Sequence, residues 1–95
     1  MSERSPIEQR AGEIAATRAE SVRLLETATH ASLKDIIRLA LHDLDEGLTW
    51  LRTADSIGEP SAARMAGLNI AAARGRLMIV KDAIEKRGPD AILVR

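Results

Sequence analysis

The sequence predicts an all-α fold, a three-helix up-down bundle with long helices at about residues 6–28, 32–57 and 60–87. Apolar residues recur at the spacing of one helical face through each of these segments. Each segment also opens on a helix-start signal, and Gly with Pro follows the second and third segments. The 95 residues are expected to form a single helical domain, since a chain of this length supports one hydrophobic core.

The first predicted helix begins at Ser5, Pro6 and Glu8. Ser is a good N-cap, Pro fits the first helical position, and Glu three residues after the cap can complete a capping box. The apolar stripe is narrow, so this helix is expected to cover the other two; the stripe comprises Ile7, Ala11, Ile14, Ala15, Val22 and Leu25. Residues 29–32 are predicted to form a turn, with Ser32 as the next N-cap. The alternative is one continuous helix through these four residues.

The second predicted helix carries apolar residues over roughly half of its circumference, more than a surface helix needs. It is therefore expected to lie centrally and to contact more than one neighbour, and Gly58 is its predicted C-cap. Its central stripe is Leu33, Ile37, Ala40, Leu44, Leu48 and Leu51, with Ile36, Leu39, Trp50 and Ile57 on one flank and Leu41 on the other.

The third predicted helix has two apolar stripes, more than a terminal helix can bury in a monomeric three-helix bundle. One stripe is Ala62, Ala66, Ile70, Ala73, Leu77, Val80 and Ile84, and the other is Met65, Leu68, Ala72, Ile79 and Ala83. The sequence therefore predicts a homodimer with its seam at Ala66, Ile70, Ala73 and Leu77, where small residues permit close helix approach. The alternative is that the small residues of this helix reflect only an Ala-rich composition and form no dimer seam. Residues 88–95 are predicted to form a short apolar tail.

The composition of the sequence argues against some classes of binding partner and indicates the cellular location of the protein. Lys plus Arg and Asp plus Glu both count 14, and the only aromatic residue is one Trp, which argues against a nucleic-acid partner. The absence of Cys excludes disulfides and thiolate zinc sites. No apolar run reaches the length of a membrane span, and the first residues do not resemble a signal peptide, so the predicted location is cytoplasmic with no membrane partner.

Several polar side chains fall inside or beside the apolar arcs, with Arg18 at the centre of the stripe of the first predicted helix. They are Arg18, Asp43, Asn69 and Arg76, with Asp55 at the angle of Ile37. A buried charge without a partner costs several kcal/mol, so these residues should be paired or should line a pocket. We expect Arg18 to pair with Asp43 or Asp55, within its own chain or across the dimer. The alternatives are long side chains that reach out to solvent, or an anion-binding cluster of Arg18, Asp43, Asn69 and Arg76.

His42 and Glu46 are one helical turn apart and form the only weak candidate for a metal site. Their neighbours form one continuous polar face, which is typical of solvated surface; they are Lys34, Asp35, Arg38, Asp45, Thr49 and Arg52. No nucleophile motif and no Gly-rich phosphate loop occurs. The sequence therefore predicts no catalytic residue, metal or cofactor.

These observations favour a non-enzymatic protein–protein interaction or regulatory module that acts as a homodimer and has a possible further protein partner. A small helical enzyme or ligand-binding bundle with an Arg-lined anion pocket is the first alternative, and a metal-binding four-helix assembly is the second. The side chains of Arg18 and Arg76 separate the first two hypotheses. Convergence on one cavity would favour the anion pocket, whereas a carboxylate beside each would favour the interaction module.

Overall fold

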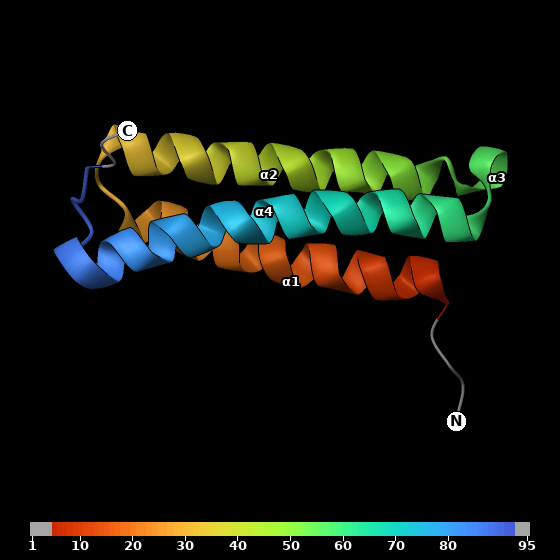
Figure 1. Ribbon diagram of the computed structural model, residues 1–95, viewed down its shortest axis with the longest axis horizontal. Coiled ribbons are helices and arrows are strands. Elements are labelled where there is room, and N and C mark those ends of the chain that lie inside the picture. Colours follow the sequence, from red (N-terminus) through yellow and green to blue (C-terminus); the bar gives the residue numbers. More distant parts are fainter. Residues whose placement is uncertain (1–4, 93–95) are drawn as a thin grey trace, which may run out of the picture.

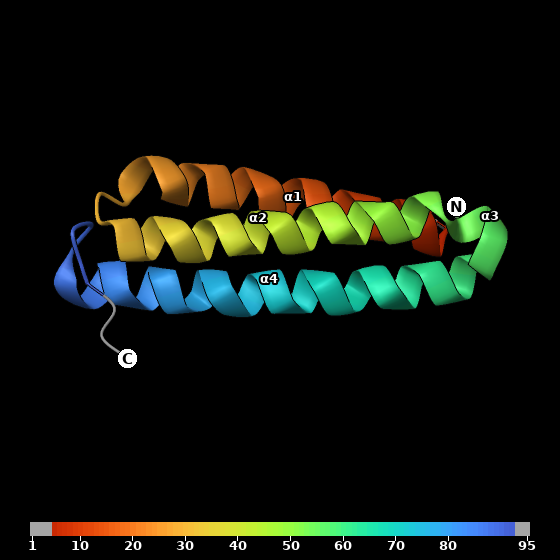
Figure 2. The same ribbon diagram turned by 90° about the horizontal axis from the view of Figure 1, so that it is seen from above.

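The computed structural model describes residues 5–92, and within that range the regular structure is entirely helical. The elements are α1 (Pro6–Thr27), α2 (Ala31–Arg52), α3 (Ala54–Ile57) and α4 (Glu59–Arg87). The three long helices lie side by side, α1 and α4 in one direction and α2 in the other, and α3 sits at one end (Figures 1 and 2). The all-α fold class is confirmed, but the described part of the chain has four helices where the sequence predicted three.

The additional helix arises because the predicted helix at 32–57 is interrupted at Thr53. The Oγ1 of Thr53 donates to the carbonyl oxygen of Trp50 at 2.8 Å, and its backbone has φ −94° and ψ 11°. A hydroxyl that bonds to a nearby carbonyl offers the backbone an alternative to the continuing helix. The single turn of α3 follows and ends at Gly58, whose φ of 89° is readily adopted only by glycine.

Two predicted helix starts have different outcomes. Ser5 is the N-cap of α1, with its Oγ accepting from the Glu8 N–H at 3.2 Å, as predicted. The predicted Ser32 cap is wrong, because α2 begins at Ala31 and its N-cap is His30. The Nδ1 of His30 accepts from the Ser32 N–H at 3.1 Å, so an imidazole nitrogen fills the place that a Ser or Asp oxygen usually takes.

The core lies between the three long helices, each of which contacts the other two. Its largest fully buried apolar side chains are Ile14 of α1, Leu33, Ile37 and Leu44 of α2, and Ile70, Leu77 and Val80 of α4. Gly47 lies where α1 approaches α2, since a Cβ there would be 3.2 Å from the Cδ1 of Ile14. The central stripe predicted for α2 and the first stripe predicted for α4 supply most of this core.

The buried face of α1 differs from the predicted one. Ile14, Thr17 and Ser21 are buried, whereas Val22 is 42% exposed. The hydroxyls of Thr17 and Ser21 donate to carbonyl oxygens four residues earlier, at 2.7 and 2.8 Å, so both side chains are satisfied without water. Arg18 therefore lies beside the buried face and not at its centre.

The segment after α4 folds back toward the start of α2 (Figure 1). The Thr29 N–H donates to the carbonyl oxygen of Pro89 at 2.9 Å, and Ala91 is buried against the core. Residues 93–95 of the predicted 88–95 tail lie outside the described residues. None of the described helices combines the length and the apolar character that crossing a membrane requires.

Candidate functional site

The four polar residues predicted to cluster divide between two sides of α2. The Nε of Arg76 donates to the Oδ2 of Asp43 at 2.9 Å, which joins α4 to α2. Asn69 lies on the same side, and its Nδ2 donates to Glu46 Oε2 at 3.2 Å. Arg18 instead joins α1 to α2 through an ion pair with Asp45.

Within one chain, the expected pairing of Arg18 with Asp43 or Asp55 is therefore wrong. Asp43 faces α4, where Arg76 occupies its carboxylate, and Asp55 lies exposed on α3. The guanidinium groups of Arg18 and Arg76 do not converge on a cavity, because each bonds to a different carboxylate of α2. This is the arrangement that a structural role for both side chains predicts.

The two ion pairs differ in their exposure to solvent. The side chain of Asp43 is 14% exposed, against 62% for Asp45. A charge that is largely withdrawn from water depends more strongly on its partner than an exposed charge does. Asp43 therefore needs Arg76 more than Asp45 needs Arg18.

The residues predicted as a dimer seam occupy the core of a single chain. Ala66, Ile70, Ala73 and Leu77 are each at most 1% exposed. Their side chains are covered by α1 and α2 and leave no surface for a second copy, so any seam on α4 must use other residues. The exposed apolar side chains of α4 include Leu68 at 62% and Ile79 at 53%, both from the other predicted stripe.

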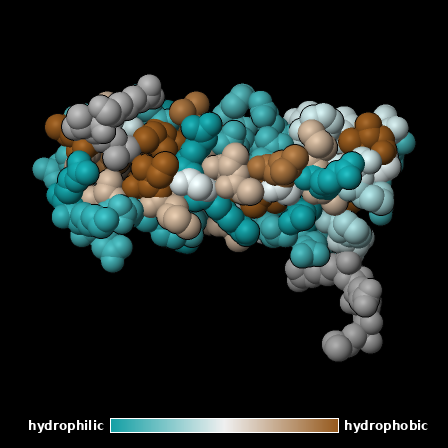
Figure 3. Space-filling model, viewed as in Figure 1, coloured by the Kyte–Doolittle hydropathy of each residue, from teal (hydrophilic) through white to brown (hydrophobic). Residues whose placement is uncertain are grey.

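These side chains belong to a surface that we name the α2–α4 face. It consists of Ile36, Leu39 and Trp50 of α2 and Met65, Leu68, Ala72 and Ile79 of α4, on either side of the Asp43–Arg76 pair. Leu39 is 47% exposed, while Ile36, Trp50 and Met65 are half-buried. Figure 3, which views the molecule from the side of α4, shows apolar side chains along the surface with polar side chains between them.

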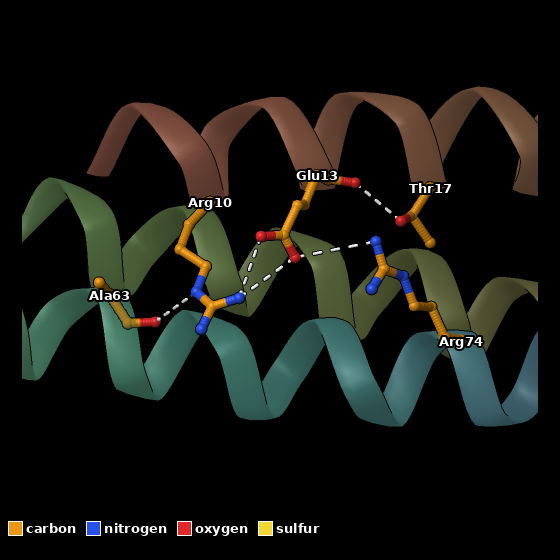
Figure 4. A network of polar contacts seen from close by, with 5 residues as sticks. All are labelled: Arg10, Glu13, Thr17, Ala63 and Arg74. Atoms are coloured by element: carbon orange, nitrogen blue, oxygen red, sulfur yellow. Dashed lines mark hydrogen bonds and ion pairs between the residues drawn. The ribbon is translucent and has the colours of Figure 1, made fainter. Parts of the chain in front are cut away.

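A polar network that the sequence reasoning missed joins α1 to α4 (Figure 4). The Nη1 of Arg10 lies 3.0 Å from Glu13 Oε1, and Arg74 Nη2 lies 3.7 Å from Glu13 Oε2. Arg10 Nε also donates to the carbonyl oxygen of Ala63 at 3.1 Å. A Cβ on Gly67 would lie 2.9 Å from Arg10 Cζ, so this glycine makes room for the guanidinium.

This network was partly visible in the sequence, because Arg10 and Glu13 have the spacing of a helical ion pair. Its link to α4 depends on how the two helices are rotated toward each other, which no local pattern gives. The carboxylate of Glu13 receives both guanidinium groups and is 21% exposed. The network ties two helices together and offers no free acid, base or nucleophile.

The shallow groove beside this network has charges of both signs. It is lined by Glu20, Arg74, Met78, Lys81, Asp82 and Glu85. Lys81 Nζ donates to Glu20 Oε1 at 3.0 Å, and Arg74 forms an ion pair with Glu13. Neither Arg18 nor Arg76 lines this groove, so it does not correspond to the predicted anion cluster.

His42 and Glu46 do lie together, with Nε2 and Oε1 3.2 Å apart, and their side chains are 67% and 53% exposed. Across residues 5–92, no group of three or more His, Asp or Glu side chains is arranged to hold a metal ion. The pair therefore has the geometry of an exposed contact between residues one turn apart.

Comparison with known protein families, curated proteins and solved structures gives no match to this chain.

Proposed function

We propose that the chain is a non-enzymatic interaction module that acts as a homodimer through the α2–α4 face. The observation that carries the proposal is the exposure of Leu39, Leu68 and Ile79, by 47%, 62% and 53%, on a chain whose core is already filled. Large apolar side chains that gather on one face and are rimmed by polar groups are typical of protein–protein contact surfaces.

The other residues of the face suit the same role. Trp50 and Met65 belong to it, and aromatic side chains, Met and Arg are enriched in the contact regions of protein complexes. The Asp43–Arg76 pair crosses the face, where a fixed charge pair gives orientation and selectivity to an apolar contact.

An anion pocket built on Arg18 and Arg76 has less support, because each guanidinium already has a carboxylate partner. An anion pocket would require at least one guanidinium that has no carboxylate partner and is free to bind the anion. The metal-binding alternative likewise has only the exposed His42–Glu46 pair in its favour.

The proposal is tested by the mass of the protein in solution. Light scattering or sedimentation velocity at micromolar concentration should give at least twice the 10.3 kDa chain mass. The triple variant Leu39→Ser, Leu68→Ser and Ile79→Ser should be monomeric with unchanged helical circular dichroism, because these side chains contribute little to the core of one chain.

A matched control removes exposed apolar side chains away from the face. Val22 of α1 and Met78, which lines the groove beside α1, are 42% and 69% exposed. The double variant Val22→Ser and Met78→Ser should keep the mass of the parent protein. A parent protein that is monomeric at micromolar concentration would contradict the proposal.

A further inference from the structure

The outward side of α4 carries a pattern that reads the same from both ends of the helix. The pattern comprises Arg64, Leu68, Ala72, Gly75, Ile79 and Asp82, all of which are exposed. Successive members are three or four residues apart, so they share one side of the helix. A charged residue stands at each end, a large apolar residue comes next, and two small residues lie at the centre.

We propose that a second copy of this chain packs on this stripe, with the two α4 helices antiparallel about a two-fold axis between Ala72 and Gly75. This inference rests on the proposed function and specifies its geometry. In such a pair Leu68 lies opposite the partner's Ile79, and Ala72 lies opposite the partner's Gly75. Each large apolar side chain then meets another, and the small residues meet at the axis.

The small residues at the centre set how closely the helices can approach. A Cβ built on Gly75 meets no atom within 4 Å, so this part of the surface is open. Helices pack 8–10 Å apart depending on the side chains between them, and small residues favour the shorter distance. Leu68 and Ile79, on either side of the axis, can then reach across to the partner.

The charges at the two ends select the antiparallel orientation. Within residues 5–92 the Arg64 side chain has no hydrogen bond or ion pair, and Asp82 receives only Lys86, at 3.2 Å on Oδ1. Antiparallel packing places each Arg64 beside the partner's Asp82, which gives two equivalent attractive pairs. Parallel packing would place like charges together, so the surface is complementary to itself in one direction only.

The position of the axis also gives the longest contact. α4 runs from Glu59 to Arg87, so its middle residue is Ala73, beside the proposed axis. Two antiparallel copies therefore overlap along the whole helix. The stripe from Arg64 to Asp82 measures about 27 Å at 1.5 Å per residue, against a long axis of 43 Å for the molecule.

Charge exchange tests the orientation. Arg64→Glu alone and Asp82→Arg alone each replace two attractive pairs with two repulsive ones, and each should weaken self-association by roughly tenfold or more. An equimolar mixture of the two variants should recover association, because the mixed dimer has opposite charges at both contacts. The variant that carries both changes in one chain should also recover association, because its homodimer has opposite charges at both contacts. This variant lacks the Asp82–Lys86 contact, as Asp82→Arg does, so its recovery would show that loss of that contact is not the cause of the weakening.

Cysteine cross-linking tests the axis, since the chain has no Cys of its own. Ala72 lies about 2 Å along the helix from the axis, which brings it close enough to its symmetry mate for a disulfide. Ala72→Cys should give a disulfide-linked dimer on mild oxidation, whereas Ala16→Cys, at an exposed position of α1, should remain monomeric on a denaturing gel.

The outcomes separate this inference from the proposed function. A parent protein of dimeric mass whose charge variants show no recovery on mixing, or whose Ala72→Cys variant does not cross-link, overturns the antiparallel α4 seam and leaves the homodimer standing. A monomeric parent protein overturns both.

Discussion

The Arg76–Asp43 and Arg18–Asp45 pairs present the same chemistry in different surroundings. Asp43 is mostly shielded from water, whereas Asp45 is well exposed. Water can solvate Asp45 once Arg18 is removed, but it can do so less well for Asp43 once Arg76 is removed. The two arginines should therefore differ in their effect on stability.

We expect Arg76→Met to lower the free energy of unfolding by about 1–3 kcal/mol, because it leaves a shielded carboxylate without its partner. Arg18→Met should lower it by less than about 1 kcal/mol, since exposed ion pairs contribute little. Urea unfolding measures both effects, with the triple serine variant as the parent so that association does not contribute.

The control for Arg76 is the double variant Arg76→Met and Asp43→Leu. It removes the unpaired charge as well as its partner, so it should recover most of the lost stability. Equal losses of the free energy of unfolding for Arg18→Met and Arg76→Met would contradict the expectation that a shielded Asp43 depends more strongly on its partner than an exposed Asp45 does. The absence of recovery in the double variant would contradict it as well.

The sequence could indicate that Asp43 and Arg76 need partners, because both lie beside apolar stripes. It could not give the partner of Arg18, since that depends on the rotation of α1. Thr17 and Ser21 are polar and do not belong to the predicted apolar stripe, yet both are buried, with their hydroxyls bonded to the helix's own carbonyl oxygens. Burial of such side chains becomes evident only when the hydrogen bonds are known.

At the scale of the helices, the ends of the elements depend on a few backbone positions. Gly58 and Gly88 have φ values of 89° and 94° and lie where the sequence predicted helix ends. Thr53 ends α2 without Gly or Pro, through a hydroxyl bonded to the carbonyl oxygen of Trp50. A Thr within an apolar pattern is not a stop signal by itself, which is why the sequence predicted one helix over residues 32–57.

The two glycines at positions 58 and 75 should respond in opposite directions to alanine. Gly58→Ala should lower the free energy of unfolding by about 1–3 kcal/mol, because its φ of 89° and ψ of 145° strain an L-residue. Gly75→Ala should raise it by up to about 1 kcal/mol, since Gly75 is helical and a Cβ there meets no atom within 4 Å. Urea unfolding in the triple serine variant measures both, and a stabilising Gly58→Ala would be incompatible with this turn.

At the scale of the whole molecule, helical periodicity predicts the all-α class but does not decide which face of α4 is buried. Both stripes of α4 are apolar, and the core contains the one with Ile70, Leu77 and Val80. Leu68 and Ile79 remain on the outside. The predicted seam therefore consisted of core residues, because a periodic pattern gives the angle between two stripes and not the position of the neighbouring helices.

The same distribution of buried side chains makes the three long helices unequal. α2 has six buried residues and α4 has eight, whereas α1 has three, of which only Ile14 is apolar. Regions with few buried apolar contacts open at lower free energy than the rest of a fold. α1 is also joined to its neighbours by polar contacts at its surface, through Arg10 to α4 and Arg18 to α2.

We therefore expect native-state hydrogen exchange to show α1 opening before α2 and α4. Amides in the middle of α1, near Ile14 and Ser21, should exchange at a lower opening free energy than those near Leu44 or Ile70. The triple serine variant should keep this order, because the inequality lies within one chain. Equal protection of the three long helices would instead mean that the chain opens only as a whole and that the small hydroxyl-bearing face of α1 packs as firmly as an apolar one.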